Sequence, residues 1–152
     1  MTQNQKFDFN ALSTNQKGVL GAALGMLIGL LLPFVDDEKI SLSVWDIFTG
    51  NVGGEEGAMV LLIMTFFSYA AFAFMGTIAF AVLTYLNQFK NGNHSLLARI
   101  SSLVVFLHVF VFIWSIGLMT GANDKSLTSA LGLGAYLLLA SSAAGIYFSR
   151  KD

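Results

Sequence analysis

The chain contains no cysteine and a single proline among its 152 residues. Without cysteine it can form no disulfide, no thiolate metal site and no cysteine nucleophile, so thiol redox chemistry is excluded. Charge is also sparse, since Asp, Glu, Lys and Arg together make up 11% of the residues and the formal net charge is -1. Because the sequence has no run of Lys or Arg, it offers no basic surface for nucleic acid, and no nucleic-acid partner is expected.

The chain is rich in hydrophobic residues, which form long uninterrupted segments. Hydrophobic residues make up 55% of it, and the mean hydropathy is +0.70, which lies outside the range of soluble domains. Each membrane span takes about 20 residues, so the chain has room for four spans but not for a separate soluble catalytic domain. The sequence therefore predicts an all-α membrane protein with a single four-helix transmembrane domain over residues 1–152 and spans at about 18–35, 58–86, 96–119 and 127–148.

The first span begins after the polar residues 13–15 and is limited by Pro33, because a proline restricts the residue before it and cannot continue a helix. A cleaved signal peptide is the alternative for this segment. Against it, the apolar core is long for such a peptide, and residues 36–38 are acidic where a small-residue cleavage site is needed. The second span is longer than a hydrocarbon core of about 30 Å requires, so we expect it to tilt or to project.

Basic residues predict the orientation of the spans. Two of them, Lys39 and Lys125, lie on one side of the predicted membrane. Six lie on the side shared by both termini and the central loop, namely Lys6, Lys17, Lys90, Arg99, Arg150 and Lys151. Because loops rich in Lys and Arg stay in the cytoplasm, both termini are predicted to be cytoplasmic, with residues 36–57 and 120–126 outside.

Small residues predict how the first span packs. Gly21, Gly25 and Gly29 repeat every four residues and form a groove that lets another backbone approach closely. Packing within the bundle is the more common use of such a groove, and contact between copies of the chain is the alternative. The motif is frequent in membrane helices, so its spacing alone does not decide between the two.

His108 is the ionisable side chain placed deepest in a predicted span. Steps of seven residues put Ser101 and Ser115 on its helix face, and we expect this polar face to point into the bundle. There Tyr69 could hydrogen-bond a neutral imidazole, since burial disfavours the cation. The functional alternative is a proton-coupled site. No Asp, Glu, Lys or Arg lies deep within a span as a relay partner for His108. The other histidine, His94, is in a loop, so no metal site is predicted.

The loop after the first span is acidic and patterned. Residues 40–44 alternate apolar and polar, which favours a short extended segment. Ser43 is a candidate N-cap for a following helix, with Asp46 reaching back to it. The loop is predicted to be a lid over the outer end of the bundle. The alternative is a recognition surface for a partner, for which the candidate residues are Asp36, Asp37, Glu38, Trp45, Asp46 and Phe48.

Enzyme signatures are absent from the sequence. It has no phosphate loop, no GxSxG, no HExxH and no pair of carboxylates within a span. We therefore expect no catalytic activity and no cofactor.

The segments 31–35 and 40–48, which read LLPFV and ISLSVWDIF, resemble a pattern in small, mostly uncharacterised bacterial four-span inner-membrane proteins, as does the ending from Gly132 to Lys151. The resemblance implies the same topology in a bacterial inner membrane and brings no established activity. The function predicted is non-enzymatic, that of an accessory, assembly or immunity-type component that binds a membrane protein or a second copy of itself. The alternative is a small oligomeric transporter or channel in which His108 is proton-sensitive.

Overall fold

The computed structural model describes residues 9–37, 40–49, 56–90, 92–121 and 131–149. These residues are mostly helical, as predicted, with a small antiparallel hairpin. The elements are η1 (Phe9–Ala11), α1 (Thr14–Leu31), β1 (Pro33–Asp37), β2 (Ile40–Ser43), α2 (Val44–Thr49), α3 (Glu56–Phe89), α4 (Ser95–Gly121) and α6 (Leu133–Phe148).

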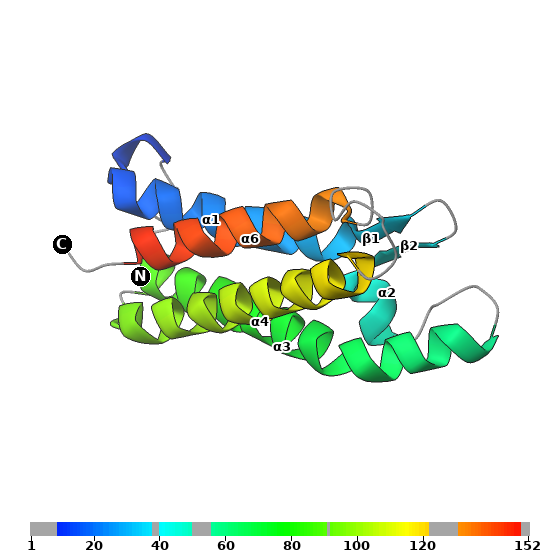
Figure 1. Ribbon diagram of the computed structural model, residues 1–152. Coiled ribbons are helices and arrows are strands. Elements are labelled where there is room, and N and C mark those ends of the chain that lie inside the picture. Colours follow the sequence, from blue (N-terminus) through cyan, green and yellow to red (C-terminus); the bar gives the residue numbers. More distant parts are fainter. Residues whose placement is uncertain (1–8, 38–39, 50–55, 91, 122–130, 150–152) are drawn as a thin grey trace.

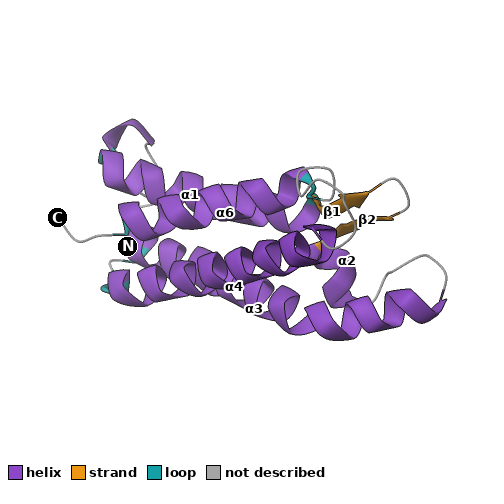
Figure 2. Ribbon diagram, in the orientation of Figure 1, coloured by secondary structure: helices purple, strands orange, loops and turns teal. Residues whose placement is uncertain are grey.

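The four long helices lie along a common axis and alternate in direction (Figure 1). Helix α1 packs beside α6, and α3 packs beside α4. The start of α1 and the end of α6 lie at the same end of the bundle as the end of α3 and the start of α4, whereas the hairpin and α2 lie at the opposite end. The strands of the described residues are confined to that opposite end (Figure 2). Helix α3 extends past the other long helices there.

The start and end of α1 have clear local causes. Ser13 is the N-cap: its Oγ accepts from the Gln16 N–H at 3.2 Å, and the Gln16 side chain accepts from the Ser13 N–H at 2.8 Å. This reciprocal pair is a capping box. The helix ends at Leu31, four residues before the predicted boundary, because Pro33 forces the residue before it out of the helical region. Residues 33–35 form strand instead.

The other predicted spans match helices to within a few residues at most ends. The α3 and α4 helices are somewhat longer than the predictions 58–86 and 96–119. The α6 helix ends at Phe148 as predicted and begins at Leu133; residues 127–130 of that prediction lie outside the described residues. Among the described residues, Phe67–Phe89 and Ser95–Leu118 are long and apolar enough to cross a membrane, and α6 is a shorter apolar helix.

The interior and the surface of the bundle are both apolar. Large side chains such as Met26, Phe80 and Leu138 are fully buried. Small polar side chains accompany them in the interior, namely Thr77, Thr84, Ser102, Ser141 and Ser142. On the outside, all four long helices expose large apolar side chains, among them Leu24, Leu31, Met75, Val82, Leu107, Trp114, Leu118 and Leu133. Exposed apolar surface on this scale requires an apolar environment or a partner.

Two of the three glycines of the predicted groove bring α1 against α6. A Cβ at Gly29 would lie 2.8 Å from the Leu138 Cγ, and one at Gly25 would meet the Ser141 side chain. Both positions therefore accept the neighbouring helix of the same chain. A Cβ at Gly21 would have no other atom within 4 Å, and this glycine is exposed. Of the predicted groove, Gly21 is thus the position that α6 leaves uncovered.

Candidate functional sites at the two ends of the bundle

The hairpin is fastened to the start of α6. Strand β1 pairs antiparallel with β2, with Val35 opposite Leu42, and Val35 also forms an isolated bridge with Leu131. The Gly132 N–H donates to the Phe34 carbonyl oxygen at 3.0 Å. A Cβ at Gly132 would collide with the Pro33 carbonyl group, so glycine is needed for this close approach.

Helix α2 is capped as the sequence predicts. The Asp46 N–H donates to the Ser43 Oγ at 3.0 Å, and the Ser43 N–H donates to the Asp46 Oδ2 at 2.9 Å. The Ser43 hydroxyl donates to the same carboxylate oxygen at 2.6 Å. The prediction of a capping box is confirmed. The Asp46 carboxylate therefore fixes the start of α2.

Aromatic side chains hold α2 against α3. The Phe48 ring stacks on Phe74 with centroids 4.4 Å apart and lies parallel to Phe67 at 6.2 Å. Trp45 lies 5.7 Å from Phe74, ring to ring, yet its side chain is 44% exposed. The neighbouring Val44 and Ile47 are buried. Residues 33–37 and 40–49, here termed the lid, thus close this end of the bundle and present Trp45 on its surface.

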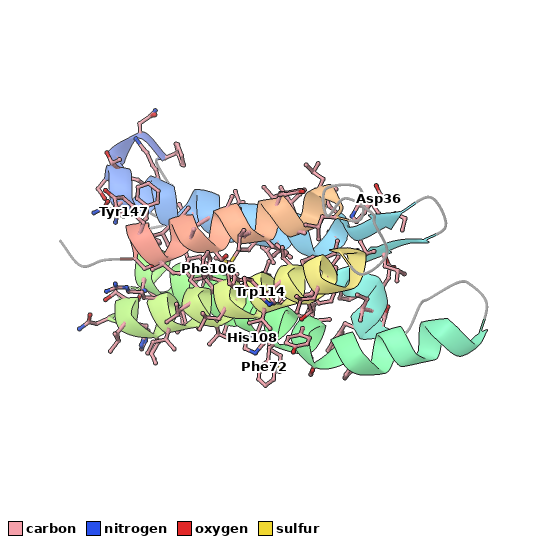
Figure 3. The ribbon with its side chains drawn as sticks, in the orientation of Figure 1. Asp36, Phe72, Phe106, His108, Trp114 and Tyr147 are labelled. Atoms are coloured by element: carbon pink, nitrogen blue, oxygen red, sulfur yellow. The ribbon has the colours of Figure 1, made fainter. Side chains whose placement is uncertain are left out.

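The acidic part of the predicted recognition surface is only partly described. Asp36 is exposed on the hairpin (Figure 3). Asp37 belongs to β1, and Glu38 lies outside the described residues. Together with Trp45, Asp36 gives the lid one anionic and one aromatic exposed side chain.

His108 lies between α3 and α4 and bonds to its own helix. Its Nδ1 is 2.7 Å from the Val104 carbonyl oxygen. Because a carbonyl only accepts, this contact places the ring proton on Nδ1. The imidazole stacks on Phe72 with centroids 4.6 Å apart, and Tyr69 lies 6.3 Å away. In Figure 3, His108 and Phe72 point in the same direction from their two helices.

The face of α4 that carries Ser101, His108 and Ser115 does not point into the interior of the bundle, contrary to the expectation for it. Ser101 donates to the Leu97 carbonyl at 3.0 Å, and Ser115 donates to that of Val111 at 2.8 Å. A hydroxyl satisfied by the carbonyl four residues earlier needs no partner from the bundle. All three predicted polar residues are half-buried. The buried face of α4 consists instead of Ala98, Ser102, Val105, Val109, Phe112 and Ile116.

A small cavity lies beside His108, under the lid. It has about 10 Å³ of space for the centre of a water molecule, which is roughly the room that one water needs. Its walls are almost entirely carbon, and its described lining residues are Phe34, Val44, Ile47, Tyr69, Ala70, Ala73, His108, Val109 and Phe112. Among these described lining residues, Tyr69 and His108 are the two with a polar side chain.

A much larger polar pocket lies at the opposite end, and the sequence interpretation missed it. It has a volume of about 430 Å³. The residues that line it come from the ends of four helices: Ser13, Asn15, Gln16, Val19, Asn87, Gln88, Gly92, Asn93, Ser95, Ala98, Phe148 and Ser149. The sequence signal that could have indicated this pocket is the pair Asn15 and Gln16 near the start of the first span together with Asn87 and Gln88 at the end of the second. Asn87 also shapes the turn after α3, since its Oδ1 accepts from the His94 N–H at 2.7 Å.

Comparisons of this chain with protein-family models, with curated proteins and with solved structures found no match.

Proposed function

We propose that this chain is an integral membrane protein in which α1, α3, α4 and α6 are the spans and both termini are cytoplasmic. The observation that carries the proposal is the outward display of large apolar side chains by all four helices. Leaving such side chains in water costs about 1.5–3 kcal/mol each. In lipid the cost vanishes, and the buried Ser and Thr side chains become normal components of a helix interface.

Charge supports the orientation. Lys17 near the start of α1, Lys90 just after α3 and Arg99 near the start of α4 belong to the end of the bundle opposite the lid. Asp36 and Asp46 belong to the lid. Under the positive-inside rule, the lid then faces outward. Helix α6, with 16 residues, is about 24 Å long at 1.5 Å per residue. A span this short can be accommodated if the bilayer thins slightly around it. The extended backbone at Gly132, just before α6, also adds to the length of the segment.

The function proposed for this membrane protein is non-enzymatic. It acts as an accessory, assembly or immunity-type component of a bacterial inner membrane, and it binds another integral membrane protein through the lid. Four features support the lid as the contact surface. It is fastened at Gly132, capped at Asp46 and packed on Phe74. A surface ordered before binding loses little entropy when the partner arrives. It exposes Trp45, a residue type enriched in interface hot spots.

The transporter alternative has less support. The His108 ring is bonded within its own helix and stacked on Phe72. The adjacent cavity is the size of one water, and lid residues line it. A transport route needs water or polar groups along its length.

The test is purification of the tagged full chain from its native membrane in mild detergent, followed by mass spectrometry of the intact complex. We expect a second membrane protein in fixed ratio, which Trp45→Ala and Asp36→Arg reduce and Leu24→Ala, a change on the exposed face of α1, does not. A homo-oligomer without another protein would favour the transporter. A monomer that carries only lipid would contradict the partner-binding proposal.

A further inference from the structure

The polar pocket between the span ends, here termed the inner pocket, has a lining suited to a ligand rich in hydroxyl groups. Its described lining residues include no charged side chain. Eight of them carry neutral groups that donate or accept hydrogen bonds: Ser13, Asn15, Gln16, Asn87, Gln88, Asn93, Ser95 and Ser149. Amide side chains offer a donor and an acceptor side by side, which matches two neighbouring hydroxyl groups.

Two polar atoms in this lining are buried without a partner. The Ser149 side chain is 7% exposed, and its Oγ forms no hydrogen bond in the structure. The Oε1 of Gln88 is likewise buried and unpaired. Buried polar groups are almost always satisfied, so each of these atoms needs an explanation. An acceptor at Gln88 and a hydroxyl at Ser149 would both be satisfied by O–H groups of a ligand in the pocket.

Three basic residues stand close to lining residues in the sequence. Lys17 follows Gln16, with its Nζ 5.4 Å from the centre of the Phe9 ring, Lys90 lies two residues beyond Gln88, and Arg99 follows Ala98. Among the described residues, no Asp or Glu belongs to this end of the bundle. An anionic group at the mouth of the pocket would therefore be attracted.

Apolar residues complete the lining. Val19, Ala98 and Phe148 contribute carbon surface, against which the C–H groups of a polyol can pack. The lining thus combines amides, hydroxyls and an aromatic ring, and cations lie next to it in the sequence. This set fits a phosphate that bears a polyol.

We propose that the inner pocket binds the polyol phosphate headgroup of an anionic phospholipid from the cytoplasmic leaflet. This proposal rests on the membrane placement and orientation proposed above. Basic pockets between span ends on the cytoplasmic side are places where anionic headgroups bind. The headgroup hydroxyls contact Gln88 and Ser149, and the phosphate lies towards Lys17, Lys90 and Arg99.

The experiment measures lipid binding to the full chain in detergent by intact-complex mass spectrometry. The probes are phosphatidylglycerol, phosphatidic acid as an anion without the polyol, phosphatidylethanolamine as a zwitterion, and soluble glycerol phosphate. We expect phosphatidylglycerol to bind at least tenfold more tightly than the other two lipids. Gln88→Leu and Ser149→Ala should each remove most of that preference. Ser115→Ala is the matched control, because its hydroxyl bonds its own helix away from the pocket.

Several outcomes would overturn the proposal. One such outcome is equal binding of all three lipids. Another is an unchanged preference for phosphatidylglycerol in both Gln88→Leu and Ser149→Ala. Either would show that the pocket does not distinguish lipid headgroups. If soluble glycerol phosphate binds as tightly as the lipid, the ligand of the pocket would be a soluble polyol phosphate and not a lipid headgroup. Partner capture through the lid is measured separately with Trp45→Ala, so the lipid proposal can fail while partner binding stands, and the reverse. Recovery of the chain in the soluble fraction of its native cells would contradict both the partner-binding proposal and the lipid-binding proposal.

Discussion

The Ser102 hydroxyl on α4 donates to the Ser142 carbonyl oxygen on α6 at 2.8 Å, inside the bundle. A Cβ at Gly145, one turn further along α6, would meet the same Ser102 oxygen. The hydroxyl thus occupies a notch that glycine leaves open, and both residues are fully or almost fully buried. A small polar side chain and a glycine together set how closely α4 and α6 approach.

Replacing Ser102 by Ala should cost about 0.6 kcal/mol of unfolding free energy, the average for a hydrogen bond between membrane helices. Ser102→Leu should cost several times more, because the notch at Gly145 cannot hold the added carbons. Reversible unfolding in mixed micelles with increasing SDS measures both. Ser101→Ala serves as the control and should be neutral, since Ser101 bonds its own helix.

Gly29→Ala should destabilise the chain by about 1–3 kcal/mol through overpacking against α6. A methyl group there would lie 3.2 Å from the Leu138 main-chain nitrogen, which cannot rotate away. Gly21→Ala should cause no loss, because nothing lies within 4 Å. The same SDS titration compares the two. If Gly21→Leu lowers the mass of an oligomer while the monomer stays folded, Gly21 makes the contact between copies.

Ser43→Ala should loosen the lid, since loss of an N-cap costs about 1 kcal/mol. The expected readout is a red shift of Trp45 fluorescence, measured in a Trp114→Phe background so that a single indole reports. Ser41→Ala changes an exposed serine of the same hairpin and should leave the spectrum unchanged. An identical shift in both variants would mean that the cap does not hold α2.

Because the chain has no cysteine, any cysteine introduced by substitution will be its sole thiol. Labelling that thiol therefore tests the proposed membrane orientation. Asp36→Cys should react with a membrane-impermeant maleimide in intact cells, and Asn93→Cys should react only after permeabilisation. Both positions are exposed in the structure. The reverse pattern would invert the proposed orientation without affecting the helix packing.

His108→Leu should cost about 0.5–1.5 kcal/mol of unfolding free energy, because it removes the stacking of the imidazole on Phe72 of α3. The imidazole hydrogen bond lies within α4. In liposomes, wild type and variant should give the same pH-dye trace as empty vesicles. Proton flux in the wild type that the variant abolishes would restore the transporter alternative.

The sequence predicts correctly those features that depend on residues close together in the chain, such as helix limits and helix caps. The limits of α4 lie close to the predicted span, and Ser43 and Asp46 form the expected cap because their spacing alone determines it. Pro33 was recognised as the limit of α1, although the strand that follows it was not placed there.

The buried face of α4 could not be predicted in the same way. In a helix that is apolar all round, Ser101 and Ser102 look alike, yet one bonds its own turn and the other crosses to α6. The inner pocket was missed for a related reason. Its unpaired groups, Gln88 and Ser149, are distant in sequence and line the same pocket only once the bundle has formed.

The pairing of α1 with α6 has a consequence for how the protein is made. During synthesis α1 emerges first, whereas α6, which receives the faces of Gly25 and Gly29, emerges after α3 and α4. The later pair are neighbours both in the sequence and in space, so they can associate as soon as both have been made. Until α6 is made, the face of α1 that carries Gly25 and Gly29 lacks its partner helix, and in the membrane placement proposed above it would contact lipid. The Gly132 link to the hairpin forms only when the bundle closes.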